Sequence, residues 1–90
     1  MTIYYLNWGY DVDKFKEICQ ALEIKYKDLK KEELLVDIDD SLIQVYKQGR
    51  KEIIVSNSVE LDLIKARTNI DLSDFAYTIA IVKNGEIIYK

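Results

Sequence analysis

The sequence predicts a single small α/β domain spanning residues 1–90, with a mixed sheet in the order β-α-β-α-β-α-β-β and a C-terminal β-hairpin. Three observations lead to this expectation. Ninety residues leave room for one core, and 49% apolar with 32% charged residues is an ordinary globular composition. Segments with strand and helix periodicity alternate along the chain. Asn84-Gly85 lies between two β-rich runs, as in a tight hairpin.

The first strand and the first helix have the strongest local signals. Residues 2–8 read TIYYLNW, with apolar side chains at both odd and even positions, which is typical of a strand covered on both faces. Gly9 and Tyr10 form a turn, and Asp11 is a good N-cap. The helix that follows has an apolar stripe made of Val12, Phe15, Ile18, Cys19 and Leu22.

The next segments predict a strand and a long helix. In residues 24–29, Ile24 and Tyr26 alternate with lysines, as in a half-exposed strand. Residues 31–48 fit one amphipathic helix that ends before Gly49. Its apolar residues fall within an arc of about 120°; they are Leu34, Leu35, Ile38, Leu42, Val45 and Tyr46. The alternative is a break at Asp39 or Asp40 that leaves residues 33–38 as a strand.

The last part of the chain predicts a strand, a helix and a hairpin. Residues 52–56 form a short buried strand. Asn57 and Glu60 have capping-box spacing, ahead of a helical stripe containing Val59, Leu63, Ala66 and Ile70. Residues 76–82 and 86–89 form the hairpin around a type I′ turn. Its two-residue loop pairs Lys83 with Glu86, Ile81 with Ile88 and Ala80 with Tyr89.

Composition argues against several functional classes. Sixteen acids against 13 Lys and Arg give a net charge of −3, so direct nucleic-acid binding is disfavoured. No apolar run approaches the roughly 20 residues of a membrane span, and we expect a cytoplasmic protein with no membrane partner. The chain has no histidine, one cysteine and no catalytic motif, so we expect neither an enzyme nor a metal or cofactor site. Cys19, on the apolar stripe, is expected to be structural.

The acidic stretch 32–40 is the leading candidate site. It holds five carboxylates in nine residues, and on a single helix the outward side combines charge with two exposed aliphatic residues. A solvated helix face is the plain alternative. The predicted partner-binding surface on this helix consists of Glu33, Val36, Asp37, Asp40 and Ile43, the last of which follows the acidic stretch.

These observations predict a small interaction protein that acts by occupying a partner protein, with no chemistry of its own. The partner would have a basic, nucleic-acid-binding groove, and the chain would inhibit it as anti-restriction, anti-CRISPR or immunity proteins do, an analogy of size and charge alone. The alternative is a binder of a small ligand or single-stranded nucleic acid that uses Trp8 and Tyr10 at the end of the first strand. A homodimer is also expected, because the hairpin offers a sheet edge.

Overall fold

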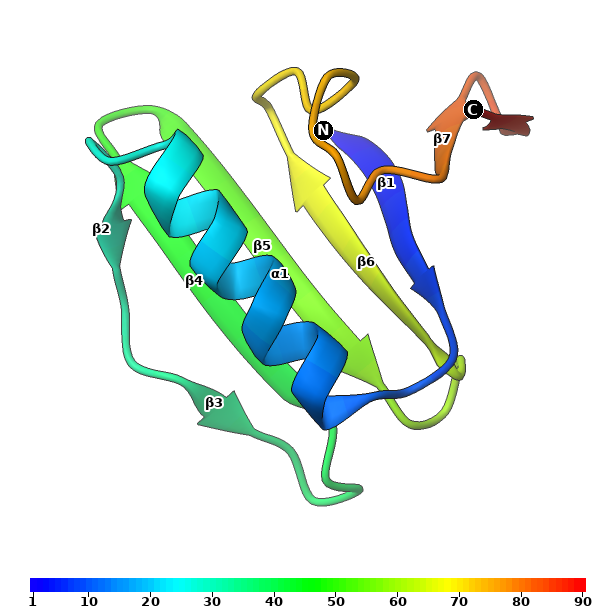
Figure 1. Cartoon of the computed structure of the whole chain (residues 1–90), viewed down its shortest axis with the longest axis horizontal. Helices are drawn as coiled ribbons and strands as arrows, with labels where there is room; N and C mark the ends of the chain where they lie inside the picture. The colour runs from blue at the N-terminus through cyan, green and yellow to red at the C-terminus, as the bar shows by residue number, and fades with distance from the viewer.

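One α-helix lies across one face of an eight-stranded antiparallel sheet in the computed structural model, which describes residues 1–90 (Figure 1). The elements in chain order are β1 (Thr2–Trp8), α1 (Val12–Lys25), β2 (Lys30–Lys31), β3 (Leu35–Val36), β4 (Leu42–Gln48), β5 (Lys51–Ser58), β6 (Leu63–Thr68), β7 (Ala80–Lys83) and β8 (Glu86–Tyr89).

The sheet order is β2-β4-β5-β6-β1-β7-β8, with β3 paired to β4 beside β2. Every strand pair is antiparallel, so the expected mixed sheet with parallel neighbours is wrong. The predicted order of elements is also wrong, because the chain has one helix and not three. Only β1 and β2 are joined through a helix, and the remaining connections are loops and hairpins that reverse the chain.

The first strand and helix confirm their predictions. β1 has the expected bounds, and the Asp11 carboxylate caps α1 by accepting a hydrogen bond from the Lys14 backbone N–H at 2.9 Å. Phe15, Ile18 and Leu22 of the predicted stripe are buried, as is Cys19. The one helix, α1, has 14 residues and is not long and apolar enough to cross a membrane.

The predicted strand at residues 24–29 is absent. α1 continues to Lys25, and the chain then turns toward the two-residue strand β2. Ile24 lies on the outer side of the helix and is 70% exposed. The alternation of Ile24 and Tyr26 with lysines resembled a strand because a helix end with exposed lysines gives the same short pattern.

The predicted helix at residues 31–48 is also wrong, because this segment forms β2, β3 and β4. β4 forms a hairpin with β5, in which Gln48 pairs with Lys51 across Gly49 and Arg50. Gly49 has a φ of +58°, so it serves this tight turn and not a helix end. The alternative strand at residues 33–38 is confirmed only for Leu35 and Val36 of β3.

The predicted helix that starts at Asn57 is replaced by the end of β5, a turn and β6. The side chain of Asn57 nevertheless contacts a helix start. It is fully buried in β5, and its Oδ1 accepts a hydrogen bond from the Asp11 backbone N–H at 3.1 Å, at the N-terminus of α1. The capping-box spacing of Asn57 and Glu60 therefore marks no helix start, and the contact of Asn57 with α1 is made through the tertiary structure.

The C-terminal hairpin has the predicted register, although its first strand begins at Ala80 instead of residue 76. Asn84 and Gly85 have φ values of +52° and +78°, as a type I′ turn requires.

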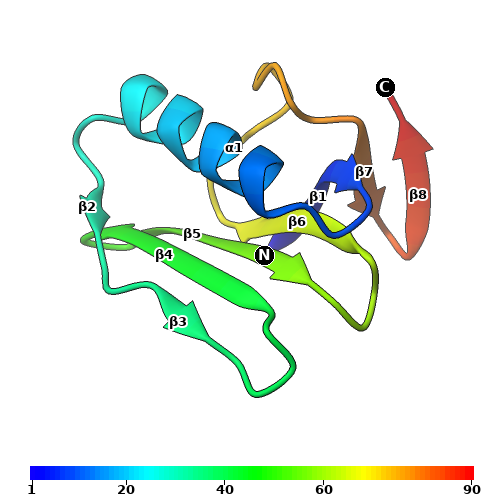
Figure 2. The same cartoon turned by 60° about the horizontal axis from the view of Figure 1, so that its bottom comes forward.

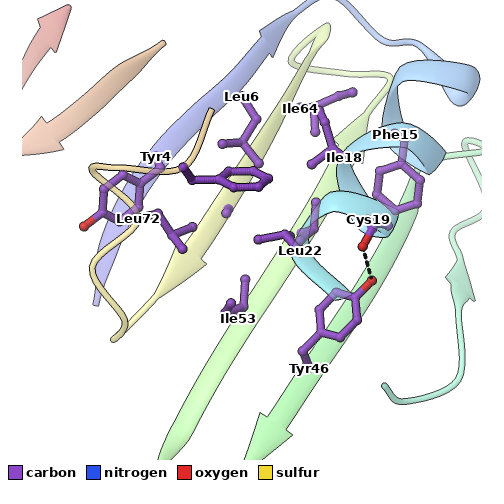
Figure 3. Close-up of a cluster of buried hydrophobic side chains, with 13 residues drawn as sticks. Tyr4, Leu6, Phe15, Ile18, Cys19, Leu22, Tyr46, Ile53, Ile64 and Leu72 are labelled. Carbon is purple, nitrogen blue, oxygen red and sulfur yellow. Dashed lines mark hydrogen bonds between the residues drawn. The ribbon is translucent and has the colours of Figure 1, made fainter. Parts of the chain in front are cut away.

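The core lies between the sheet and two covering segments, α1 and the chain after β6 (Figure 3). Tyr46 of β4 points beneath the helix, and its hydroxyl donates to the Glu23 carboxylate at 2.6 Å and lies 3.4 Å from the Cys19 carbonyl oxygen. Leu72 and Phe75 cover the sheet beside the helix. Apart from Ala80, the core side chains of the strands project to this covered face.

The opposite face, which we call the open face, is not covered by α1 (Figure 2). The strand register places two long cross-strand rows of side chains on it. One row holds Val45, Ile54, Arg67, Ile3, Val82 and Ile87. The other row holds Ile43, Ser56, Lys65, Tyr5, Ala80 and Tyr89.

Candidate functional site

Residues 32–41 run along the outer edge of β4 and form the candidate site, which we call the acidic edge segment. In Figure 1 this segment, which contains β3, lies along the side of β4 that faces away from β5. Every residue from Lys31 to Asp40 is exposed. The segment is extended because Leu35 and Val36 pair with Ile43 and Leu42, and β3 has no strand on its other side.

The acidic edge segment exposes apolar side chains that a monomer would normally bury. The exposed fractions are 44% for Leu34, 53% for Leu35, 62% for Val36 and 99% for Ile38. Carboxylates flank them along the chain, from Glu33 before Leu34 and from Asp37, Asp39 and Asp40 around Ile38. Apolar groups that are exposed together and surrounded by charge are typical of interaction surfaces.

Hydrogen bonds fix the tip of the segment. The Asp37 backbone N–H donates to the Ser41 carbonyl at 2.8 Å, and the Asp40 N–H donates to the Asp37 carbonyl at 3.0 Å. The Asp39 carboxylate accepts from the Ser41 N–H at 2.9 Å, and hydrogen bonds from Ser41 hold the pKa of Asp39 below its usual range. The tip therefore holds the Asp39 carboxylate and the backbone on both sides of Ile38 in a defined conformation.

Two side chains anchor the tip to the rest of the fold. The Tyr10 hydroxyl donates to the Asp40 carbonyl oxygen at 3.0 Å. The buried Ser41 hydroxyl accepts from the Val59 backbone N–H at 2.9 Å, in the turn after β5. Segments that are distant in sequence thus hold the tip in place.

The predicted partner-binding residues are brought together only in part. Glu33, Val36, Asp37 and Asp40 all lie in the acidic edge segment, along an extended chain and not on a helix face. Ile43 lies in β4 on the open face, paired with Leu35, and is half-buried.

Sequence reasoning missed Leu34, Leu35 and Ile38, which it assigned to the buried side of a helix. The alternation of Leu34, Val36 and Ile38 indicated a strand in this segment. The helical prediction was preferred because the apolar residues of 31–48 also fit one side of a helix.

The charges of the chain are unevenly distributed. β4, β5, β6 and β1 together carry four Lys or Arg residues and one acid, Glu52. The rest of the chain, which includes the acidic edge segment, carries fifteen acids against nine basic residues. The negative potential is therefore concentrated outside the central strands.

A groove of about 230 Å³ lies between α1 and the start of the acidic edge segment. Leu34 forms one wall, and Lys16, Gln20 and Glu23 of α1 form another. Within the groove, Lys31 forms an ion pair with Glu23 at 3.4 Å. The groove is thus continuous with the apolar side chains of the segment and extends the surface open to a partner.

Cys19 also borders this groove but is 6% exposed. Burial raises the pKa of its thiol to about 11. The thiolate that reacts with electrophiles is therefore scarce near neutral pH, consistent with a structural cysteine.

We expect Cys19 to resist thiol reagents in the native state. At pH 8, 5,5′-dithiobis-(2-nitrobenzoate) should react at least about 10-fold more slowly with the folded chain than with the chain in denaturant, because the native thiol is both protonated and covered. Cys19→Ser should leave partner binding and oligomeric state unchanged. Native labelling as fast as denatured labelling would contradict this assignment.

The alternative site residues Trp8 and Tyr10 are separated by the structure. Trp8 is 53% exposed on the open face, where its ring centroid lies 5.1 Å from that of Tyr5 and 6.3 Å from that of Tyr89. Tyr10 contacts the tip of the acidic edge segment instead. A ligand site that uses both rings remains a prediction.

No protein-family model, no curated protein and no solved structure matches this chain. The geometry of the site therefore carries the functional argument.

Proposed function

We propose that this chain is a small acidic protein-interaction module whose acidic edge segment occupies the surface of a partner protein. The observation that carries the proposal is the exposure of Leu34, Leu35, Val36 and Ile38 in a hydrogen-bonded segment that also carries carboxylates. Apolar side chains supply contact area, and the carboxylates select a partner of opposite charge.

The partner is a protein with a basic groove beside an apolar patch. A groove that binds nucleic acid has this chemistry, because lysines and arginines line it to neutralise phosphates. By occupying such a groove the chain acts as an inhibitor of a nucleic-acid enzyme, as anti-restriction, anti-CRISPR and immunity proteins do. This last step rests on analogy of size and charge.

Strand addition is the binding mode that suits the edge. β3 is paired only to β4, so the backbone on its other side is free to pair with an extended segment of the partner. Ile38 then acts as an apolar anchor, and Asp37 and Asp40 steer association.

Charge reversal with a matched control tests the proposal. We expect Asp37→Lys with Asp40→Lys to lower the affinity for a basic partner at low salt by at least about 10-fold and to flatten its salt dependence. Ile38→Ala should mainly speed dissociation. Asp74→Lys with Glu86→Lys makes the same charge change at exposed positions away from the segment and should leave affinity nearly unchanged.

The measurement is affinity capture from nuclease-treated host lysate, followed by titration calorimetry of the captured protein at two salt concentrations. A basic protein retained by the wild type and by the control, and lost by the Asp37/Asp40 variant, supports the proposal. Equal retention by all three proteins places the interface elsewhere.

A further inference from the structure

The open face has the composition of a sheet face that is buried. In an antiparallel sheet with one solvated face, the residues on that face are normally polar. Here the row through Ile54 is apolar in five of its six positions, and Arg67 is the exception. The sequence pattern of β1 also predicts a strand covered on both faces. In the monomer, four apolar residues of this row are half-buried and Ile87 is exposed, because α1 and the chain after β6 pack on the opposite face. Further cover of this face therefore comes from outside the monomer.

We infer that the open face packs against the open face of a second copy of this chain. Face-to-face packing of two identical sheets gives a sandwich with a second apolar layer between them. This homodimer does not rest on the proposed function, because the acidic edge segment lies at the rim of the sheet.

The size of the face fits this occupant. The molecule measures 29 × 29 × 20 Å, and the view down the shortest axis shows the sheet face-on behind the helix (Figure 1). A sheet face within this outline is of the same order of size as the roughly 800 Å² that each partner buries in a standard protein interface. The size of the face is therefore compatible with a dimer.

The limited core of the monomer supports the same conclusion. Only 19 of the 90 residues are buried. A domain of this size has little apolar burial of its own, and oligomerisation is a common way to add more. Trp8 and Tyr89, which are 53% and 69% exposed, would gain cover in the dimer.

The charges on the face are compatible with a second copy and unfavourable for nucleic acid. Lys47 forms an ion pair with Glu52 at 3.1 Å, which leaves Lys65 and Arg67 outside the four ion pairs of the chain. Two free cations among isoleucines and valines give little phosphate affinity. Their long side chains can lie along apolar neighbours and extend their charged ends to the solvent at the edge of the interface.

Sedimentation equilibrium at high micromolar concentration tests the dimer. We expect twice the 10.6 kDa chain mass for the wild type. Ile54→Lys places a charge in the middle of the interface and should raise the dimer dissociation constant by at least about 30-fold. Ile24→Lys makes the same change on the outer side of α1 and should leave the dimer intact.

Two further measurements keep the test decisive. Ile54→Thr keeps a β-branched side chain, and we expect its dimer dissociation constant to be about 5-fold higher than that of the wild type. Circular dichroism verifies that each variant is folded. The fluorescence of Trp8, the sole tryptophan, should shift to shorter wavelength as wild-type concentration rises, because dimerisation buries its ring.

Three results would overturn the inference. They are a 10.6 kDa species for the wild type at high micromolar concentration, a dimer that folded Ile54→Lys leaves unchanged, and stoichiometric quenching of Trp8 by oligothymidylate at low salt that Arg67→Glu abolishes. The last result would assign the open face to single-stranded nucleic acid.

Discussion

Leu22→Ala is expected to lower the free energy of unfolding by about 2–5 kcal/mol, because truncation of a buried leucine removes apolar contacts and leaves a cavity. Leu22 is 1% exposed and lies in the core cluster beneath α1. In a domain of this size, each 1 kcal/mol corresponds to about 4–8 °C of melting temperature. We therefore expect a fall of at least about 8 °C in a thermal unfolding scan followed by circular dichroism.

The matched control for this variant is Ile24→Ala, two residues further along the same helix. Ile24 is 70% exposed, so its truncation should change the unfolding free energy by about 0.5 kcal/mol or less. Equal losses for the two variants would contradict the assignment of residue 24 to the outer side of α1. Because the proposed dimer makes melting temperature depend on concentration, both variants are compared at the same concentration.

Asn57→Ala is expected to cost about 2–3 kcal/mol, the second largest effect. Asn57 is fully buried, and its Oδ1 accepts the Asp11 backbone N–H at the start of α1. The substitution removes the acceptor of that amide and also leaves space in the core. The Asn57 side-chain amide nitrogen has no hydrogen-bond partner, so removing it breaks no hydrogen bond. This limits the loss of unfolding free energy.

Ser56→Ala is the control for Asn57→Ala, because Ser56 is the neighbouring residue on the open face of the same strand. Chemical denaturation should show a change of about 0.5 kcal/mol or less for this variant. Hydrogen exchange adds a local readout. The first turn of α1 should lose protection in Asn57→Ala, and unchanged exchange there would show that Asn57 does not hold the helix start.

The position of the acidic edge segment was predicted in part from the sequence. The acidic stretch and four of its five nominated residues lie on the exposed segment. The accompanying apolar surface was assigned incorrectly, because Leu34, Leu35 and Ile38 were placed in the core of a helix. The composition of a segment is independent of its backbone conformation, whereas the side to which each side chain points depends on it.

The sequence by itself determined the elements whose signals are local. Asp11 begins α1 because its carboxylate reaches an amide three residues away, and Asn84-Gly85 sets the hairpin register because both residues adopt positive φ. The stripe through Phe15, Ile18 and Leu22 identified the buried side of the only helix. In each case the residues that decide the structure lie within a few positions of one another.

Only the tertiary structure decided between helix and strand for residues 31–48 and 57–70. Apolar residues in these segments satisfy both a period of 3.6 and a period of 2, so the local pattern leaves both conformations open. Pairing of β4 and β6 with the two sides of β5 satisfies their backbone hydrogen bonds and places Tyr46, Val55 and Ala66 beneath α1. The free energy of that choice comes from contacts between residues distant in the chain, which no short window of sequence contains.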